Sequence, residues 1–361
     1  MHSERRKVTL INALVLALIL FICPLAPALA ITDADLYTAR VAVADQSTES
    51  RNQALEAALA QVLRRVSGDQ AAVLAGETLQ PRALMQRYEY RRDEDAPDGL
   101  WLLVAFDESA IVRGLRDQGY GVWGRERPTT LVWLGVRDGV QRTVLSREHD
   151  GPVAQALVRA SRAHGLPVML PEGDEAERGT VEFIDLWGGF FETVEDASER
   201  YGAGSILAGR VDRDSGGDYR GRWTLLEQGR RRDWESHAGG LQAVINEGLA
   251  GLADIYIARF AIGADDVDRD VARIAVSGVG GLSDYARVLQ YLEGLSPVDA
   301  VYVTRVAGDR LDLALVIQGS RERLDGVIGV GSVLHARDRV MVTVDESSAR
   351  VGPDFHYALE H

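Results

Sequence analysis

Residues 181–211 constrain the fold of this chain more than any other stretch. Apolar side chains recur there at helical spacing before an apolar run, which predicts a strand, an amphipathic helix, a glycine turn and a buried strand. Asp185 stands where an N-cap is expected, because its carboxylate can accept the unpaired amides of a first turn. Gly188 and Gly189 each cost the predicted helix about 1 kcal/mol, so a neighbouring element is expected to approach that face closely.

Residues 1–30 have the pattern of a secretory signal peptide. Three basic residues precede an apolar run at residues 8–22, and Ala28-Leu29-Ala30 follows two prolines. This pattern predicts export to the periplasm, with cleavage after Ala30. The alternative is an uncleaved inner-membrane anchor, but the run is short for a span of about 20 residues. Cys23 is the only cysteine, so the exported chain contains no disulfide and no thiolate ligand.

The exported chain is strongly acidic. The whole sequence has 40 basic and 54 acidic residues, and removing residues 1–30 takes away three basic residues and one acidic residue, which leaves a net charge of −16. Such a charge argues against nucleic acid and anionic membrane surfaces as main partners. Lys7 is the only lysine. The exported chain therefore has no P-loop lysine, Schiff-base lysine or Ser-x-x-Lys nucleophile.

Hydrophobic periodicity divides the exported chain into three α/β units. Residues 31–127 predict an N-terminal βα(α)ββα module, and residues 128–263 predict a middle α/β domain with a mixed sheet. Residues 264–338 predict a C-terminal βαββα module, after an acidic linker at 264–268. Residues 339–361 are expected to form a tail that adds one strand, at 340–344, and then frays.

The predicted elements follow from alternating or helical spacing of apolar residues. Asp107 is predicted to cap the helix at 110–118, and residues 173–179 are predicted to be a polar loop. The other predicted helices are 47–66, 79–86, 153–164, 241–260, 284–292 and 322–328. The other predicted strands are 36–43, 87–90, 100–106, 131–136, 166–170, 219–226, 231–237, 271–276, 300–306 and 311–317.

No motif predicts a catalytic residue, a cofactor or a metal. Residues 277–283 (SGVGGLS) resemble a dinucleotide loop only superficially, because Ser283 replaces the third glycine. Asp266, Asp268 and Asp270 have calcium-loop spacing, but Val271 occupies the position of the required glycine. The histidines lack close ligand spacing, and no serine has the Gly-x-Ser-x-Gly context. A paired-carboxylate hydrolase stays open, since distances between acidic residues are not visible in a sequence.

The junction between the first two units is the candidate partner-binding surface. Trp123, Arg125 and Arg127 lie close together there, and Trp and Arg are over-represented in binding hot spots. The alternative interpretation is that Trp123 packs the seam between units and that the arginines pair with the abundant acidic residues.

Five segments carry a family resemblance: QALEAALAQVLRRVSGD (53–69), GVWGRERPTTLVWL (121–134), IDLWGGF (184–190), ASERYGAGSILAGRV (197–211) and DYARVLQYLEGL (284–295). In this order they resemble the exported bacterial "domain of unknown function 2066" family. Weaker local similarity links residues 36–68 to flagellar assembly protein T and RYGAGSILAGRV to the amino-terminal domain of Tol system protein B. The resemblance implies a Gram-negative periplasmic protein and supplies no site residues.

The first functional hypothesis is a non-enzymatic adaptor or assembly factor of the cell envelope that binds protein partners. Its acidic surface is expected to select basic or polar partners. The alternative is a periplasmic hydrolase or small-ligand-binding protein that uses a cleft between the middle and C-terminal units. A structural ring subunit is a third hypothesis, and the sequence leaves the oligomeric state open.

Overall fold

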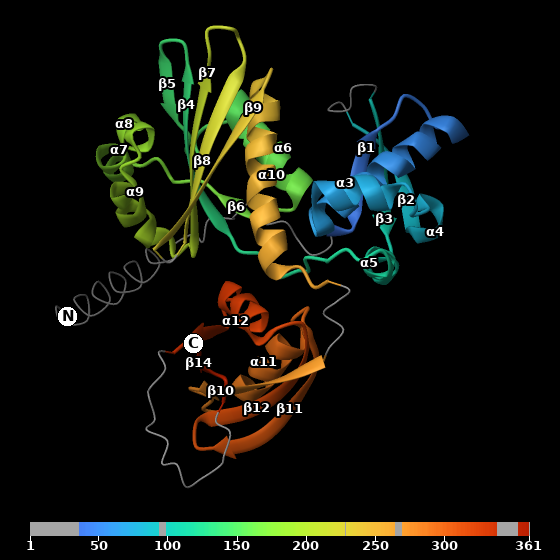
Figure 1. The fold of residues 1–361 in the computed structure, drawn as a ribbon, viewed down its shortest axis with the longest axis vertical. Helices are drawn as coiled ribbons and strands as arrows, with labels where there is room; N and C mark the ends of the chain where they lie inside the picture. The colour runs from blue at the N-terminus through green and yellow to red at the C-terminus, as the bar shows by residue number, and fades with distance from the viewer. Residues whose placement is uncertain (1–35, 94–98, 228, 264–268, 338–352, 361) are drawn as a thin grey trace, which may run out of the picture.

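The computed structural model describes residues 36–93, 99–227, 229–263, 269–337 and 353–360 (Figure 1). Helices and strands alternate along the chain, and the strands form three separate sheets. This confirms the predicted α/β class. The predicted signal peptide with its cleavage site, the linker at 264–268 and the strand at 340–344 lie outside the described residues.

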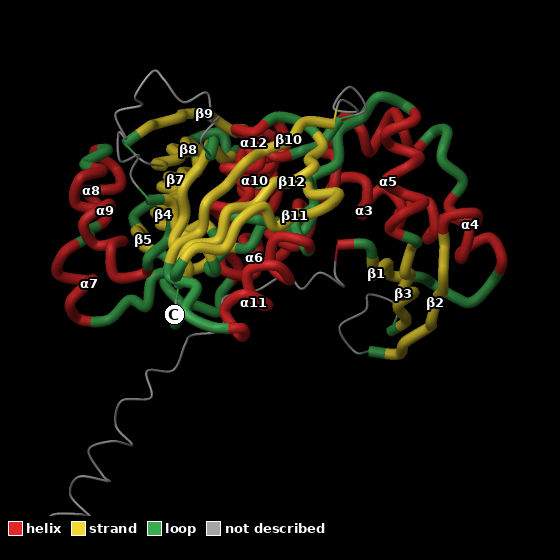
Figure 2. Tube along the Cα trace, turned by 90° about the horizontal axis from the view of Figure 1, so that it is seen from below, coloured by secondary structure: helices red, strands yellow, loops and turns green. Residues whose placement is uncertain are grey.

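The first unit is a three-stranded antiparallel sheet with helices against one face, and it lies to one side of the other two sheets (Figure 2). Residues 100–106 form a strand, β3, with the predicted bounds, and its residues point alternately into the core and outward. The strands, in spatial order, are β1 (Thr38–Ala42), β3 (Leu100–Phe106) and β2 (Met85–Arg92). The helices are α3 (Thr48–Gly76), α4 (Pro81–Leu84) and α5 (Glu108–Asp117), the last capped by Asp107.

Helix α3 does not stop at Gly68 as predicted. Gly68 takes a non-helical conformation with a φ of 88°, and the chain then returns to helix as far as Gly76. Glycine tolerates this left-handed φ, so it bends the helix without ending it. The second half persists because Ala71, Ala72 and Ala75 are buried against the first unit's core.

The middle unit has a six-stranded mixed sheet with helices on both faces (Figure 1). β4 pairs in parallel with β6 and β7, while the other pairs are antiparallel, which confirms the predicted mixed sheet. The strands are β4 (Thr130–Asp138), β5 (Gln141–Val144), β6 (Val168–Met169), β7 (Ser205–Arg213), β8 (Tyr219–Glu227) and β9 (Arg230–Ala238). Helices α6 (Pro152–His164) and α10 (Leu241–Phe260) cover one face.

The helical part of residues 181–211 covers the opposite face of this sheet. The predicted order of strand, helix, glycine turn and strand for these residues was partly wrong. The strand predicted at the start of residues 181–211 is absent, since helix begins at Phe183. The predicted loop at 173–179 contains a short helix. Gly189, with a φ of 75°, splits the predicted helix in two, and Asp185 is not the N-cap but accepts the amide of the N-cap residue Glu182. The helices are α7 (Glu175–Thr180), α8 (Phe183–Gly188) and α9 (Phe191–Ser198), followed by the 3-10 turn Glu199–Tyr201.

The third unit has a five-stranded sheet, and its C-terminal strand corrects the prediction of a fraying tail. β14 (Phe355–Leu359) lies inside the sheet, parallel to β10 (Arg269–Ser277) and antiparallel to β13 (Leu334–Ala336). Tyr357 and Leu359 are buried, so this strand completes the core. The other elements are α11 (Leu282–Glu293), β11 (Val298–Ala307), β12 (Arg310–Gln318) and α12 (Arg321–Val330).

The middle and third units share one apolar cluster, whereas the first unit has its own. Phe260, the last residue of α10, lies between the two sheets. A Cβ on Gly326 of α12 would come 3.3 Å from its ring, so this glycine lets α12 approach α10 closely. The middle and third units are therefore packed together rather than merely linked.

Gly248 tests a different close contact, the packing of α10 against the middle sheet. A Cβ at this position of α10 would come 2.0 Å from the buried ring of Trp223. Alanine normally favours a helix over glycine, but here we expect Gly248→Ala to lower the free energy of unfolding by about 2 kcal/mol, because overfilling a core costs more than helix propensity returns. Urea denaturation followed by circular dichroism measures the change.

Gly329 in α12 is the matched control. No atom lies within 4 Å of the position of its Cβ, so Gly329→Ala is expected to leave stability unchanged or to raise it by about 0.5 kcal/mol. Equal effects of the two substitutions would contradict the close contact at Trp223.

Candidate functional site

The predicted junction is a buried connection between units. Trp123 is 1% exposed and stacks on Phe260, with ring centroids 6.4 Å apart and nearly parallel planes. Its amide donates to the Val66 carbonyl at 2.7 Å, and its indole Nε1 donates to the Glu126 carbonyl at 3.2 Å. Trp123 therefore ties the bend of α3 to the end of α10.

Arg127 is buried at the same seam and is 8% exposed. Its guanidinium lies 3.9 Å from the centroid of the Trp123 ring and donates to four main-chain carbonyls. Burial lowers the pKa of Arg127 to about 9, so the side chain stays charged at neutral pH. The four carbonyls are those of Arg65 at 2.9 Å, Trp123 at 3.0 Å, Gly124 at 3.0 Å and Gly165 at 2.8 Å.

Two of these carbonyls belong to helix C-termini, which explains how a buried cation is tolerated. Arg65 lies just before the bend of α3 at Gly68, and Gly165 is the C-cap of α6. Carbonyls at such positions lack their intrahelical donors and carry the negative end of the helix dipole. Arg127 satisfies both ends at once.

The predicted partner patch of Trp123, Arg125 and Arg127 is therefore corrected. Trp123 and Arg127 are buried and present no surface to a partner, because they hold the units together. Arg125 alone is exposed, and it forms an ion pair with Glu108 at 2.5 Å. The alternative interpretation is right for Trp123, which packs at the seam, and for Arg125, which pairs with an acidic residue. Arg127 differs from it, because it bonds main-chain carbonyls rather than acidic residues.

A second charged cluster, not predicted from the sequence, lies on the middle sheet. We call it the arginine face, and its members project from the side of the sheet that α8 and α9 partly cover. The β4–β5 and β7–β8 hairpins extend beyond these helices (Figure 1). The arginine face consists of Arg137, Arg142, Arg210, Arg220, Arg222 and Arg231.

The strand register places like charges opposite each other. Arg137 on β4 faces Arg142 on β5, and Arg210 on β7 faces Arg222 on β8. Like charges directly opposite on neighbouring strands destabilise a sheet. Two such pairs on one face therefore oppose folding, and sites where local preferences are violated are expected to be functional.

Carboxylates on this face balance only part of the charge. Arg137 pairs with Asp212 at 3.3 Å, and Arg231 pairs with Asp233 at 3.0 Å. Glu235 serves two arginines, Arg220 at 2.8 Å and Arg222 at 3.6 Å. Among the described residues, no ion pair is formed by Arg142 or Arg210. The face carries six arginines and three carboxylates, in a protein whose overall net charge is −14.

Arg210 occupies the centre of the face. Burial lowers the pKa of Arg210, and the neighbouring Arg222 and Arg231 lower it further. Its NH1 donates to the Trp187 carbonyl at 3.2 Å, while its buried Nε has no hydrogen-bond partner in the described part of the chain. A buried polar atom without a partner is rare in native proteins, so this position is strained electrostatically.

Aromatic residues of α8 and α9 border the arginine face. Arg137 lies 4.5 Å from the Trp187 ring centroid, and Arg231 lies 4.6 Å from that of Phe191. Ile184 and Phe190 are 57% and 59% exposed. The Trp187 ring supports an arginine.

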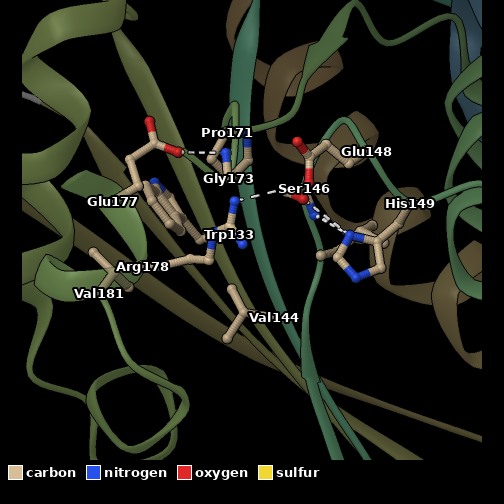
Figure 3. Close-up of a pocket in the computed structure, with 11 residues that line it drawn as sticks. Trp133, Val144, Ser146, Glu148, His149, Pro171, Gly173, Glu177, Arg178 and Val181 are labelled. Carbon is tan, nitrogen blue, oxygen red and sulfur yellow. Dashed lines mark hydrogen bonds and ion pairs between the residues drawn. The ribbon is translucent and has the colours of Figure 1, made fainter. Parts of the chain in front are cut away.

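A small pocket opens on the same side of the middle unit (Figure 3). Its volume is about 110 Å³, and Trp133, Val144 and Val181 form apolar walls. The Ser146 amide donates to His149 Nδ1 at 3.1 Å, and the Ser146 hydroxyl lies 2.9 Å from the same nitrogen. Arg178 and Glu148 stand 4.0 Å apart among the residues that line the pocket.

Glu177 is buried beside this pocket, and its carboxylate makes structural contacts. Its carboxylate accepts the Gly173 amide at 2.7 Å and the Tyr201 hydroxyl, and it lies 3.4 Å from Arg200. Burial first and this hydrogen bond second raise the pKa of Tyr201. These contacts anchor α7 to the turn before β7.

The described ranges, 36–93, 99–227, 229–263, 269–337 and 353–360, contain neither a metal cluster nor a membrane-spanning helix. No group of three or more His, Cys, Asp or Glu residues there has the geometry to hold a metal ion. Within the same ranges, no helix combines the length and apolar character needed to cross a membrane.

Comparison with known proteins adds one partial match. The model of a domain of unknown function (DUF8605) matches residues 30–124, which correspond to the first unit. This family differs from the one that the sequence motifs resemble. No curated protein matches the chain. A solved structure described only as an uncharacterized protein is similar over 36% of this chain and 90% of its own, with 12% identity and a TM-score of 0.17, which is too low to support a statement about the fold.

His164, where α3, α6 and α10 meet, makes the free energy of unfolding depend on pH. It is buried, and its Nε2 donates to Asn246 Oδ1 at 3.2 Å. Burial lowers the pKa of His164 below its ordinary value of 6.5, partly opposed by Asp69 of α3. The unfolded chain therefore binds a proton before the folded chain does, and stability falls as the pH drops below about 6.5.

Arg127→Lys is expected to lower the free energy of unfolding by roughly 3 kcal/mol. An ammonium cannot reach four carbonyls in a planar fork or stack on Trp123, so buried acceptors lose their donors. Urea denaturation provides the measurement. Arg125→Lys, at the exposed neighbouring position, is the control and is expected to change stability by less than about 1 kcal/mol. A small effect at Arg127 would contradict its role at the helix ends.

His164→Gln is expected to flatten the pH dependence of stability. Between pH 7.5 and pH 5.5 the wild-type protein should lose more unfolding free energy than the variant, because glutamine binds no proton. Thermal melts across this range test the difference. Parallel curves for wild type and His164→Gln would show that His164 does not contribute.

Proposed function

We propose that this protein is a non-enzymatic adaptor or assembly factor of the bacterial cell envelope, exported by a cleaved signal peptide, and that it binds a protein partner through the arginine face. The proposal is carried by the two like-charge pairs, Arg137 with Arg142 and Arg210 with Arg222. Such pairs cost stability in the free protein. A bound anionic group would remove that cost.

The composition of the face also supports protein binding. Arginine and aromatic side chains dominate binding hot spots, and Phe190 and Ile184 add exposed apolar area beside the arginines. The overall acidity of the chain favours basic partners, but this surface has the opposite local charge. The arginine face thus replaces the junction as the candidate surface.

A second candidate function is a hydrolase or small-ligand-binding protein that uses the pocket in Figure 3. The observation in its favour is the hydrogen bond from Ser146 to His149, which is the arrangement of a nucleophile and its base. No third side chain among the described residues orients His149 from Nε2, and Ser146 is buried. The predicted cleft between the middle and C-terminal units is replaced by the shared core.

Affinity capture from crosslinked cells tests the proposal. The tagged full chain is expected to retain a protein partner from the envelope, and the double variant Arg137→Glu, Arg222→Glu is expected to reduce its recovery about tenfold, because attraction becomes repulsion. Quantitative mass spectrometry of the captured material provides the readout.

The matched control is the double variant Arg113→Glu, Arg305→Glu, which makes the same charge change at exposed arginines of the first and third units. It should retain the partner. Circular dichroism and melting temperature confirm that both double variants are folded. Recovery of the same partner in equal amount with all three proteins would exclude the arginine face as the binding surface.

A further inference from the structure

The geometry points to a ligand class for this surface: we infer that the arginine face binds an acidic segment of a protein in an extended conformation. The inference rests on the proposed function and adds the chemistry that the partner must present. It is argued from the spacing of the arginine pairs, from the carboxylates between them and from the neighbouring apolar side chains.

Each like-charge pair forms a subsite for one anionic group. Arg137 and Arg142 sit beside the stacked rings of Trp187 and Phe183, whose centroids are 4.8 Å apart. Cross-strand neighbours have Cβ atoms about 5 Å apart, so one carboxylate can accept hydrogen bonds from both guanidinium groups. An anion placed there neutralises the repulsion within the pair.

The second subsite consists of Arg210 and Arg222, with Arg231 at its edge. Arg210 and Arg231 lie 6.0 and 4.6 Å from the Phe191 ring centroid, so this aromatic ring holds both guanidinium groups in place. Side chains fixed by packing lose less entropy when a ligand binds. This pre-organisation favours a carboxylate over solvent at the subsite.

The distance between subsites indicates the shape of the ligand. Their centres are two strand spacings apart across the sheet and two residues apart along it, which gives about 12 Å with ordinary sheet dimensions. An extended polypeptide covers that distance in three to four residues. Two acidic side chains separated by three or four positions therefore match both subsites.

Carboxylates within the face argue against a uniform polyanion. Asp212 lies on β7 directly opposite Arg137, with which it forms an ion pair. Glu235 lies on β9 directly opposite Arg222. A polyphosphate chain or an anionic bilayer would place negative charge against both acidic residues at a cost. A polypeptide can avoid that cost with a neutral or basic residue opposite them.

The apolar border supplies a further element of recognition. A Cβ on Gly189 would lie 3.9 Å from NH1 of Arg210, so this part of the chain lies next to the second subsite, and the exposed Phe190 is the next residue along the chain. An apolar residue beside the second acidic residue of the ligand can cover the exposed Phe190 side chain. The recognised segment is therefore acidic and contains an apolar residue near its second carboxylate.

A labelled synthetic peptide tests the inference on the full exported chain. The probe is a ten-residue peptide with two glutamates four positions apart and an adjacent leucine, and its binding is measured by fluorescence anisotropy. Binding is expected at low ionic strength and should weaken at least about tenfold when both glutamates are replaced by glutamine. Raising the salt concentration from 50 to 500 mM should weaken it as well.

A charge exchange identifies the site. Arg222→Glu should weaken binding of the acidic peptide at least about tenfold and should bind the same peptide with its glutamates changed to lysine more tightly than the wild type does. Arg113→Glu should behave as the wild type. A loss caused only by misfolding would not produce the gain for the lysine peptide.

Three results would overturn the inference. They are equal binding of the glutamate and glutamine peptides, tighter binding of inorganic polyphosphate or phosphatidylglycerol vesicles that Arg222→Glu abolishes, and dimerisation of the free chain that Arg222→Glu abolishes. If the captured partner still depends on Arg137 and Arg222 while the acidic peptide does not bind, the adaptor function stands and only the ligand class fails.

Discussion

The Arg127 guanidinium is the interaction on which the arrangement of the units depends. It is a buried cation stabilised by main-chain carbonyls, two of them at the ends of helical segments, α3 before its bend and α6 at its C-cap. Because a guanidinium is planar and has five N–H groups, it can bond both ends while stacking on Trp123. The bend at Gly68 frees the carbonyls of Arg65 and Val66, which Arg127 and Trp123 then satisfy. A glycine in one unit and an arginine between units are thus parts of one contact.

The distribution of charge separates regions with different roles. The chain as a whole is acidic, with a formal net charge of −14. The middle sheet departs from it, with arginines placed opposite arginines on neighbouring strands and only partly compensated. Ordinary ion pairs elsewhere, such as Arg321 with Asp270 and Asp354, join elements within one unit. The arginine face also contains ion pairs that join neighbouring strands, but its two like-charge pairs do not stabilise the sheet, which is why it stands out as a candidate binding surface.

Local patterns predicted much of the architecture and little of the site. Helix α10 and strand β3 have the predicted bounds, because continuous apolar spacing and flanking turn residues determine them locally. The strand predicted before α8 failed because Gly189 and the Glu182–Asp185 cap allow two short helices to cover the sheet instead. The arginine face could not be predicted, since Arg137, Arg210 and Arg222 meet only through the pairing of three strands. The alternating Arg220 and Arg222 and the consecutive Arg230, Arg231 and Arg232 were the available signal, but a sequence alone does not give the register of their strands.

Strand β14 has a kinetic consequence. It completes the third sheet by pairing Ile274 with Phe355, residues separated by most of the unit, so its central pairing is highly non-local. Contacts of this kind form late, because the entropy of closing a long loop must be overcome before they contribute. Until then, β10 exposes an unpaired edge and the core lacks Tyr357. The folding chain therefore passes through a state in which the third unit stays open along β10 until residues 355–359 reach it.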